Sequence, residues 1–158
     1  MPQRLHYARH APGVYEAMSA LDGYLESVGL DQPLLHLVRL RASQLNGCAY
    51  CIDMHWKDLR ALGETEQRLA LLDAWQESPF YTERERAALA WAEAITLVAA
   101  DRAPDRIFAV AREHFGEREL ADLTLAVATI NAWNRLSIAA RLEPGTYTPT
   151  AMATTVTP

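Results

Sequence analysis

The sequence predicts an all-α fold, a single-domain helical bundle of about six to seven helices with short connections. Three observations favour it. Apolar residues recur at helical spacing through most of the chain. Proline and capping residues open these segments, and glycine closes several of them. The segments between these helices show no alternation of apolar and polar residues, which a β-strand would require.

The first three helices are predicted over residues 12–28, 31–46 and about 48–62. Pro12 opens the first, because the N–H that proline lacks is unpaired in a first turn anyway. Asp31 is expected to cap the second helix with its carboxylate. A glycine follows each of the three helices, as is common at a helix end.

The remaining helices are predicted over residues 65–75, 84–100, 104–115 and 119–141. Thr82 and Glu85 have the spacing of a capping box before the helix that starts near residue 84. The Pro- and Thr-rich segment 144–158 has no periodic apolar face. We therefore expect a helical domain over residues 1–143, and a tail over 144–158 that is either disordered or packed on a neighbouring subunit.

Composition narrows the possible functions. The 158 residues suit one compact domain. A net charge of -5, from 15 basic and 20 acidic residues, argues against a nucleic-acid-binding protein. The N-terminal residues lack the apolar core of a signal peptide, and the apolar run 87–100 contains Glu93 and is too short to cross a bilayer. We expect a cytoplasmic protein that binds neither nucleic acid nor membrane.

Cys48 and Cys51 are the most informative pair in the chain, and they are its only cysteines. A reducing cytosol keeps ordinary cysteines as thiols, so a Cys-x-x-Cys motif there favours redox catalysis or metal binding. Two helical residues three apart have Cα atoms about 5 Å apart, which is within disulfide range. This pair can therefore open and close without a large backbone movement.

His55 lies on the same helix face as both cysteines, four residues after Cys51. Its imidazole can take a thiol proton and so activate a nucleophile. The positive helix N-terminus favours a thiolate at Cys48, whereas the nearby base favours Cys51. We expect Cys51 to attack and Cys48 to resolve.

Two other interpretations of the cysteines remain open. Cys48, Cys51 and His55 could supply three zinc ligands, although a structural zinc site normally has four and one helix presents these three poorly. The cysteines could also be inert core residues. We predict no metal and no organic cofactor, because the sulfur atoms carry the electrons.

Residues 37–63 closely resemble the alkylhydroperoxidase D-like branch of the carboxymuconolactone decarboxylase superfamily. The residues that carry the resemblance are Arg39, Arg41, Ala42, Ser43, Gln44, Asn46, Gly47, Cys48, Cys51 and His55. Further similarity lies in residues 82–86, 90–94 and 131–135, so that only the first few residues and the tail are outside it.

This resemblance implies an all-helical subunit that forms homo-oligomers, such as dimer-based trimers or hexamers. It also implies a thiol peroxidase that reduces a hydroperoxide and is restored by an external thiol or dithiol. In this family the downstream cysteine is oxidised and the upstream one resolves it, which assigns these roles to Cys51 and Cys48. His55 then belongs to the proton relay. The alternatives are a protein dithiol–disulfide exchanger and a non-catalytic assembly module.

The chain departs from the family pattern at one relay position. The glutamate that usually stands twelve residues before the first cysteine is replaced by His36. An imidazole can pass a proton, but it is not a fixed anion at neutral pH. Glu93, on a predicted apolar helix, could supply the missing charge by pointing into the cysteine pocket. Alternatively, Glu93 faces solvent or pairs with an arginine such as Arg39.

Overall fold

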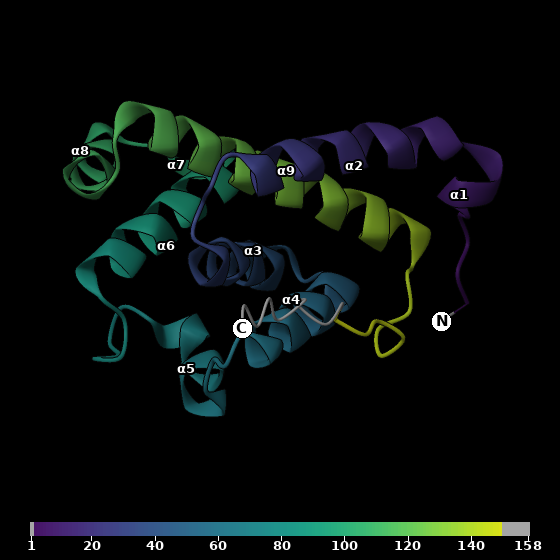
Figure 1. Cartoon of the computed structure of the whole chain (residues 1–158), viewed down its shortest axis with the longest axis horizontal. Helices are drawn as coiled ribbons and strands as arrows, with labels where there is room; N and C mark the ends of the chain where they lie inside the picture. The colour runs from purple at the N-terminus through teal and green to yellow at the C-terminus, as the bar shows by residue number, and fades with distance from the viewer. Residues whose placement is uncertain (1, 150–158) are drawn as a thin grey trace, which may run out of the picture.

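The computed structural model describes residues 2–149, and all regular structure in that range is helical, which confirms the predicted fold class (Figure 1). The longer helices are α2 (Pro12–Ser27), α3 (Gln32–Asn46), α4 (Ala49–Ala61), α6 (Glu83–Thr96), α8 (Asp105–His114) and α9 (Glu117–Ala140). The shorter elements are α1 (Tyr7–His10), α5 (Glu66–Ala70), α7 (Val98–Asp101) and the 3₁₀ helix η1 (Leu72–Ala74). The nine α-helices in residues 2–149 slightly exceed the six to seven expected.

Two of the predicted caps are present. The Asp31 carboxylate accepts a hydrogen bond of 2.9 Å from the backbone N–H of Leu34. Thr82 and Glu85 form a complete capping box, in which each side chain accepts from the other residue's backbone N–H. These bonds satisfy N–H groups that a helix start leaves unpaired, which fixes where α3 and α6 begin.

Two predicted helices are interrupted. The helix expected over residues 84–100 stops at Thr96, and α7 follows after Leu97. Leu97 and Val98 are 47% and 50% exposed, so the apolar run loses the burial that would hold it as one helix. The helix expected over residues 65–75 ends at Ala70 and continues as η1.

Helix α3 lies at the centre of the fold and packs against α4, α6 and α9, while α2 runs along α9 (Figure 1). Two sides of α3 pack into different clusters of the hydrophobic core. Leu34 and Val38 pack into a cluster with residues of α6, α8 and α9. Leu37 and Leu40 pack into a second cluster with residues of α4, α5, η1 and α6. Burying each such side chain contributes about 2 kcal/mol, which holds α3 against α4 firmly.

Gly145 and Tyr147, in the segment after α9, make hydrogen bonds to α4 of the same chain. The Gly145 N–H donates to Asp53 Oδ2 over 2.9 Å, and the Tyr147 hydroxyl donates to Asp58 Oδ1 over 2.7 Å. Lys57 Nζ donates to the Tyr147 carbonyl over 3.0 Å. The expectation for residues 150–158 lies outside the described residues.

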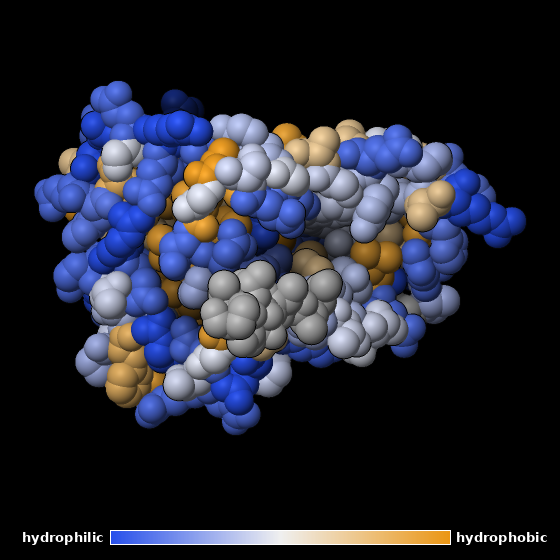
Figure 2. Space-filling view, viewed as in Figure 1, coloured by the Kyte–Doolittle hydropathy of each residue, from blue (hydrophilic) through white to orange (hydrophobic). Residues whose placement is uncertain are grey.

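The surface is mainly polar on the face seen in Figure 2, where apolar side chains form separate patches between hydrophilic ones. Among the helices of residues 2–149, none has both the length and the apolar character needed to cross a bilayer.

Candidate active site

A tight turn between α3 and α4 places the cysteine pair. Gly47 adopts φ +68°, a left-handed conformation that favours glycine. Its N–H donates to the Gln44 carbonyl, and the Cys48 N–H donates to the Ser43 carbonyl over 3.0 Å. These bonds close α3 and let α4 begin within two residues. Cys48 is the N-cap of α4, one position before the first turn in which it was expected.

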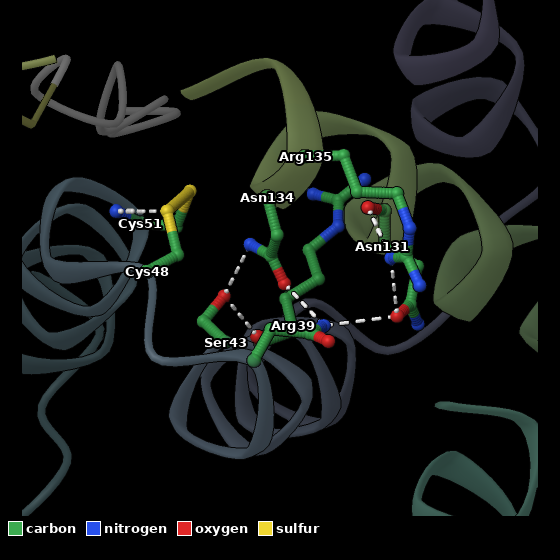
Figure 3. Close-up of a disulfide and its surroundings, with 8 residues drawn as sticks. Arg39, Ser43, Cys48, Cys51, Asn131, Asn134 and Arg135 are labelled. Carbon is green, nitrogen blue, oxygen red and sulfur yellow. Dashed lines mark hydrogen bonds between the residues drawn. A yellow bond between two sulfur atoms is a disulfide. The ribbon is translucent and has the colours of Figure 1, made fainter. Parts of the chain in front are cut away.

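Cys48 and Cys51 form a disulfide, and their Cα atoms are 5.4 Å apart (Figure 3). This distance agrees with the one predicted from helix geometry. Cys48 Sγ also accepts a hydrogen bond of 3.4 Å from the Cys51 N–H at the start of α4. Both side chains are only 1% exposed. The pair is therefore a buried dithiol/disulfide unit at a helix N-terminus, where a thiolate at Cys48 would be stabilised.

A polar network ties the turn before the cysteines to α9 (Figure 3). Asn46 Nδ2 donates to the side-chain oxygens of Asn131 and Asn134 over 2.9 and 2.8 Å. Asn134 Nδ2 donates to Ser43 Oγ over 3.0 Å, and this hydroxyl donates to the Arg39 carbonyl. Ser43 and Asn134 are fully buried, so their hydrogen bonds hold α3 and α9 in a fixed relation beside the disulfide.

Cys51 lines a cavity of about 430 Å³, which is within the size range of small-ligand sites. His36, His55 and Asp58 line the same cavity. Other lining residues include Tyr15, Asp22, Arg39, Tyr50, Met54, Trp133 and Tyr147. Cys48 lines a separate hollow with Arg141 and other residues. The two sulfur atoms therefore face different surroundings, and the one that shares a cavity with the imidazoles belongs to Cys51.

Two histidines and one carboxylate converge in this cavity. His36 comes from α3, whereas His55 and Asp58 lie one turn apart on α4. The Nδ1 atoms of His36 and His55 are 3.2 Å apart, and Asp58 Oδ2 lies 3.5 Å from the first and 3.6 Å from the second. The other carboxylate oxygen of Asp58 accepts the hydrogen bond from Tyr147.

Burial keeps both imidazoles neutral near pH 7. Burial, together with repulsion from His55, lowers the pKa of His36 to about 4. Burial also lowers the pKa of His55. For Asp58 burial alone would raise the pKa, but the neighbouring His55 ring and the Tyr147 hydroxyl reverse this and lower it. The cavity thus combines one carboxylate with two neutral rings.

His55 Nε2 is buried and has no hydrogen-bond partner in the described part of the chain. Its other ring nitrogen, Nδ1, faces His36 and Asp58. Since a buried imidazole nitrogen without a partner costs free energy, this atom is poised to bind another group. His55 follows Cys51 by one helical turn, so a thiol of the reduced pair is a candidate for that group.

Glu93 does not point into the cysteine pocket, where the sequence hypothesis placed it. Its Oε1 atom accepts hydrogen bonds of 2.7 Å from Arg41 Nε and from the Trp75 indole. It does not line the cavity that contains Cys51. Glu93 pairs with an arginine, as the alternative held, but this arginine is Arg41. Arg39 instead donates to Asp22 over 3.0 Å.

The structure thus brings Cys48, Cys51, His55 and His36 together, and leaves Glu93 apart. Sequence reasoning missed Asp58 and Tyr147. The spacing of three residues between His55 and Asp58 was a usable signal, because it places both on one helix face. No comparable signal marked Tyr147, which reaches α4 from the irregular segment after α9.

Known proteins resemble this chain over most of its length. The Bacillus subtilis protein YdfG, an uncharacterised protein, is 44% identical over 139 residues, or 88% of this chain and 95% of YdfG. A solved structure from Agrobacterium tumefaciens is 42% identical to this chain and has a TM-score of 0.89. It is of a protein of unknown function, a putative antioxidant defence protein AhpD. It is matched over its full length and covers 92% of this chain.

A more distant structure shares the fold. This structure is the alkylhydroperoxidase AhpD core of an uncharacterised peroxidase-related protein from Ralstonia eutropha JMP134. Its TM-score is 0.76 at 21% identity, and the match covers 87% of this chain and 73% of the other. The carboxymuconolactone decarboxylase family matches residues 12–94, which contain both cysteines and both cavity histidines. The chain belongs to the carboxymuconolactone decarboxylase family, as an alkylhydroperoxidase D-like member.

Proposed function

We propose that this chain is a thiol-dependent, peroxidase-like oxidoreductase that reduces hydroperoxides by cycling Cys48 and Cys51 between dithiol and disulfide. One observation carries the proposal: a buried cysteine pair in disulfide contact has one member in a cavity lined by two imidazoles. The similarity to a putative antioxidant defence protein is consistent with it.

In the proposed cycle, Cys51 is the peroxidatic residue. Its thiolate attacks the terminal oxygen of the hydroperoxide, the O–O bond breaks, and Cys51 becomes a sulfenic acid. The leaving oxygen takes a proton and departs as an alcohol, or as water when the substrate is hydrogen peroxide. The cavity that Cys51 lines gives such a small molecule a place to bind.

Cys48 then acts as the resolving residue. Its thiolate attacks the sulfenic sulfur of Cys51, water leaves, and the disulfide forms. The backbone N–H of Cys51 already points at Cys48 Sγ, so the start of α4 favours the thiolate that this step needs. An external thiol or dithiol returns the pair to the reduced state by disulfide exchange.

The imidazoles serve as the proton relay. His55 Nε2 has no partner in the described structure and takes the Cys51 proton in the reduced enzyme. His36 and Asp58 lie next to the opposite ring nitrogen of His55. Asp58 supplies the negative charge that the family's glutamate would give, because that position is occupied here by His36.

The burial of the disulfide favours a small substrate over a protein substrate. Each cysteine is 1% exposed, so a thiol on another protein reaches the sulfur atoms only after the local structure opens. A hydroperoxide needs only the cavity. We further propose that the enzyme is cytoplasmic and works as a dimer-based homo-oligomer, such as a trimer or hexamer.

Mass spectrometry of the reduced protein after one equivalent of hydroperoxide tests the proposal. The wild type should form an intramolecular Cys48–Cys51 disulfide. Cys48→Ser should accumulate a sulfenic acid at Cys51, trapped with a dimedone-type reagent, whereas Cys51→Ser, the matched variant, should consume no peroxide. Thiols that stay reduced in the wild type would overturn the proposal, and turnover of a protein disulfide in the same preparation would favour the exchanger instead.

A further inference from the structure

We propose that His36, His55 and Asp58 form a binding site for a divalent transition-metal ion of the Zn²⁺ type. The ligand atoms would be Nδ1 of each histidine and Oδ2 of the aspartate. The site goes beyond the proposed peroxidase function and does not depend on it, since neither cysteine is a ligand. A metal ion on Nδ1 of His55 leaves the ring proton on Nε2, so in the metal-bound chain His55 cannot accept the Cys51 proton.

The three distances between these atoms match a shared ion. They are 3.2, 3.5 and 3.6 Å, and a triangle with these sides has a circumscribed circle of radius about 2.0 Å. Zinc binds imidazole nitrogen at about 2.0–2.1 Å and carboxylate oxygen at about 2.0–2.2 Å. An ion slightly out of the plane of the triangle therefore meets all three atoms without moving the helices.

That position corresponds to tetrahedral coordination. With bonds of about 2.1 Å, the ligand atoms of a tetrahedron lie about 3.4 Å apart, whereas adjacent ligands of an octahedron lie about 3.0 Å apart. The observed separations are closer to the tetrahedral value. Three protein ligands leave a fourth position for water or a small ligand, and the cavity offers room for it.

Hydrogen bonding accounts for the contact between the two rings better than for the position of the aspartate. Protein N–H···O bonds measure about 2.7–3.2 Å. The two imidazole nitrogens are within this range of each other at 3.2 Å, whereas Asp58 Oδ2 is 3.5 and 3.6 Å from them, which is longer than a usual hydrogen bond. Each of the three atoms can offer a lone pair, and a cation between them would give Asp58 Oδ2 a closer partner than either ring.

Tyr147 orients the aspartate as an outer-shell residue of a metal site does. Its hydroxyl donates to Asp58 Oδ1 over 2.7 Å, which leaves Oδ2 directed at the two rings. Such outer-shell hydrogen bonds fix the ligating oxygen of a carboxylate. The donor set of two imidazoles and one carboxylate suits Zn²⁺, Co²⁺ or Fe²⁺ better than Mg²⁺ or Ca²⁺, which prefer oxygen ligands alone.

The experiment uses untagged protein in its disulfide form, so that thiolates cannot bind the ion. Calorimetric titration with Zn²⁺ after removal of bound metals should give one site per chain. Titration with Co²⁺ should give the intense visible absorption of a tetrahedral ion. A Cys48→Ser/Cys51→Ser protein should bind Zn²⁺ as the wild type does, which separates this site from one built on the cysteines.

Ligand variants identify the residues. His36→Gln and Asp58→Asn should weaken Zn²⁺ binding by more than tenfold, and Tyr147→Phe should weaken it by about tenfold, the lower range for an outer-shell residue. The matched controls are His114→Gln, Asp105→Asn and Tyr24→Phe; the last removes a tyrosine–carboxylate hydrogen bond to Asp122 elsewhere in the fold. No stoichiometric binding by the wild type, or equal binding by Asp58→Asn and Asp105→Asn, would overturn the proposal. Neither result depends on peroxide reduction.

Discussion

His36 Nδ1 and His55 Nδ1 lie 3.2 Å apart across the interface of α3 and α4. Two imidazolium ions cannot share this position, because like charges at such a distance repel strongly when they are largely removed from water. The packing of α3 against α4 therefore requires at least one neutral ring. This requirement links the stability of the fold to the protonation of the cavity.

Stability should fall as the pH drops from about 6.5 toward 4. The pKa of His36 is lowered to about 4 in the folded protein, so over this range the unfolded chain binds more protons than the native one. Each pH unit should then reduce the free energy of unfolding by up to about 1.4 kcal/mol per histidine. Urea unfolding at pH 7 and pH 5, in buffer with a chelator, measures the loss.

The decrease in the free energy of unfolding between pH 7 and pH 5 should be smaller in His36→Gln, because glutamine cannot take up the proton. The control His114→Gln should keep the pH dependence of the wild type, since His114 lies at the end of α8 and does not line the cavity. An equal pH dependence in all three proteins would show that the cavity histidines do not control acid stability.

Replacing His55 should slow the reaction of the reduced protein with hydroperoxide. His55→Gln keeps a polar side chain of similar reach but cannot accept the thiol proton. A positioned general base contributes about 10²–10⁴-fold, so the second-order rate constant near pH 7 should fall by at least about 10²-fold. Stopped-flow measurement of thiol loss gives this constant.

The pH profile separates a base from a merely structural residue. The wild-type rate should rise with pH through the pKa of His55, which burial lowers below its ordinary value. The His55→Gln rate should rise only as the Cys51 thiol itself ionises, nearer pH 8.5. His114→Gln is the matched control. A uniform decrease without a change in the profile would mean that His55 shapes the cavity and does not move the proton.

Glu93→Gln should leave peroxide reduction unchanged and lower stability. Glu93 Oε1 accepts hydrogen bonds from Arg41 and Trp75 and does not line the Cys51 cavity. Removing the charge weakens a partly buried charge-assisted pair, at a cost of roughly 1–3 kcal/mol. Urea unfolding and the stopped-flow assay, run on the same preparation, test both halves. Slower peroxide reduction by a variant of wild-type stability would contradict this prediction and would mean that Glu93 takes part in the reaction.

Local signals predicted the cysteine end of the site well. The Cα separation predicted for Cys48 and Cys51 is close to the observed 5.4 Å, although Cys48 is the N-cap of α4 and not a residue of its first turn. The caps at Asp31 and Thr82 were likewise readable from neighbouring residues. Interactions within one turn can be derived without knowing how the helices pack.

The remainder depends on packing between helices. Asp58 meets His36 only because α3 and α4 pack side by side, and no periodicity shows which residues face each other across that contact. From the sequence, Glu93 could point into the cysteine pocket, face solvent or pair with an arginine such as Arg39, and its pairing with Arg41 depends on where α6 crosses α3. Tyr147 belongs to a segment without periodicity, so its hydrogen bond to Asp58 was outside the reach of pattern analysis.

Asn134→Leu should destabilise the fold and loosen the cysteine turn. Asn134 is fully buried, donates to Ser43 Oγ and accepts from Asn46, the last residue of α3. The substitution removes both bonds, while Ser43 keeps its bond to the Arg39 carbonyl and Asn46 keeps its bond to Asn131, so the expected cost is about 1–3 kcal/mol in total. Urea unfolding of the disulfide form should therefore show a clear decrease in the free energy of unfolding.

The second readout of this variant is the rate of disulfide closure. Because Asn46 precedes Gly47 and Cys48, losing one of its two hydrogen bonds to α9 should broaden the positions that Cys48 samples and slow its attack on an oxidised Cys51. A longer-lived sulfenic acid after one equivalent of peroxide would reveal this by mass spectrometry. The exposed variant Gln76→Ala is the control and should change neither property. Wild-type stability together with wild-type closure in Asn134→Leu would mean that the network does not support the turn.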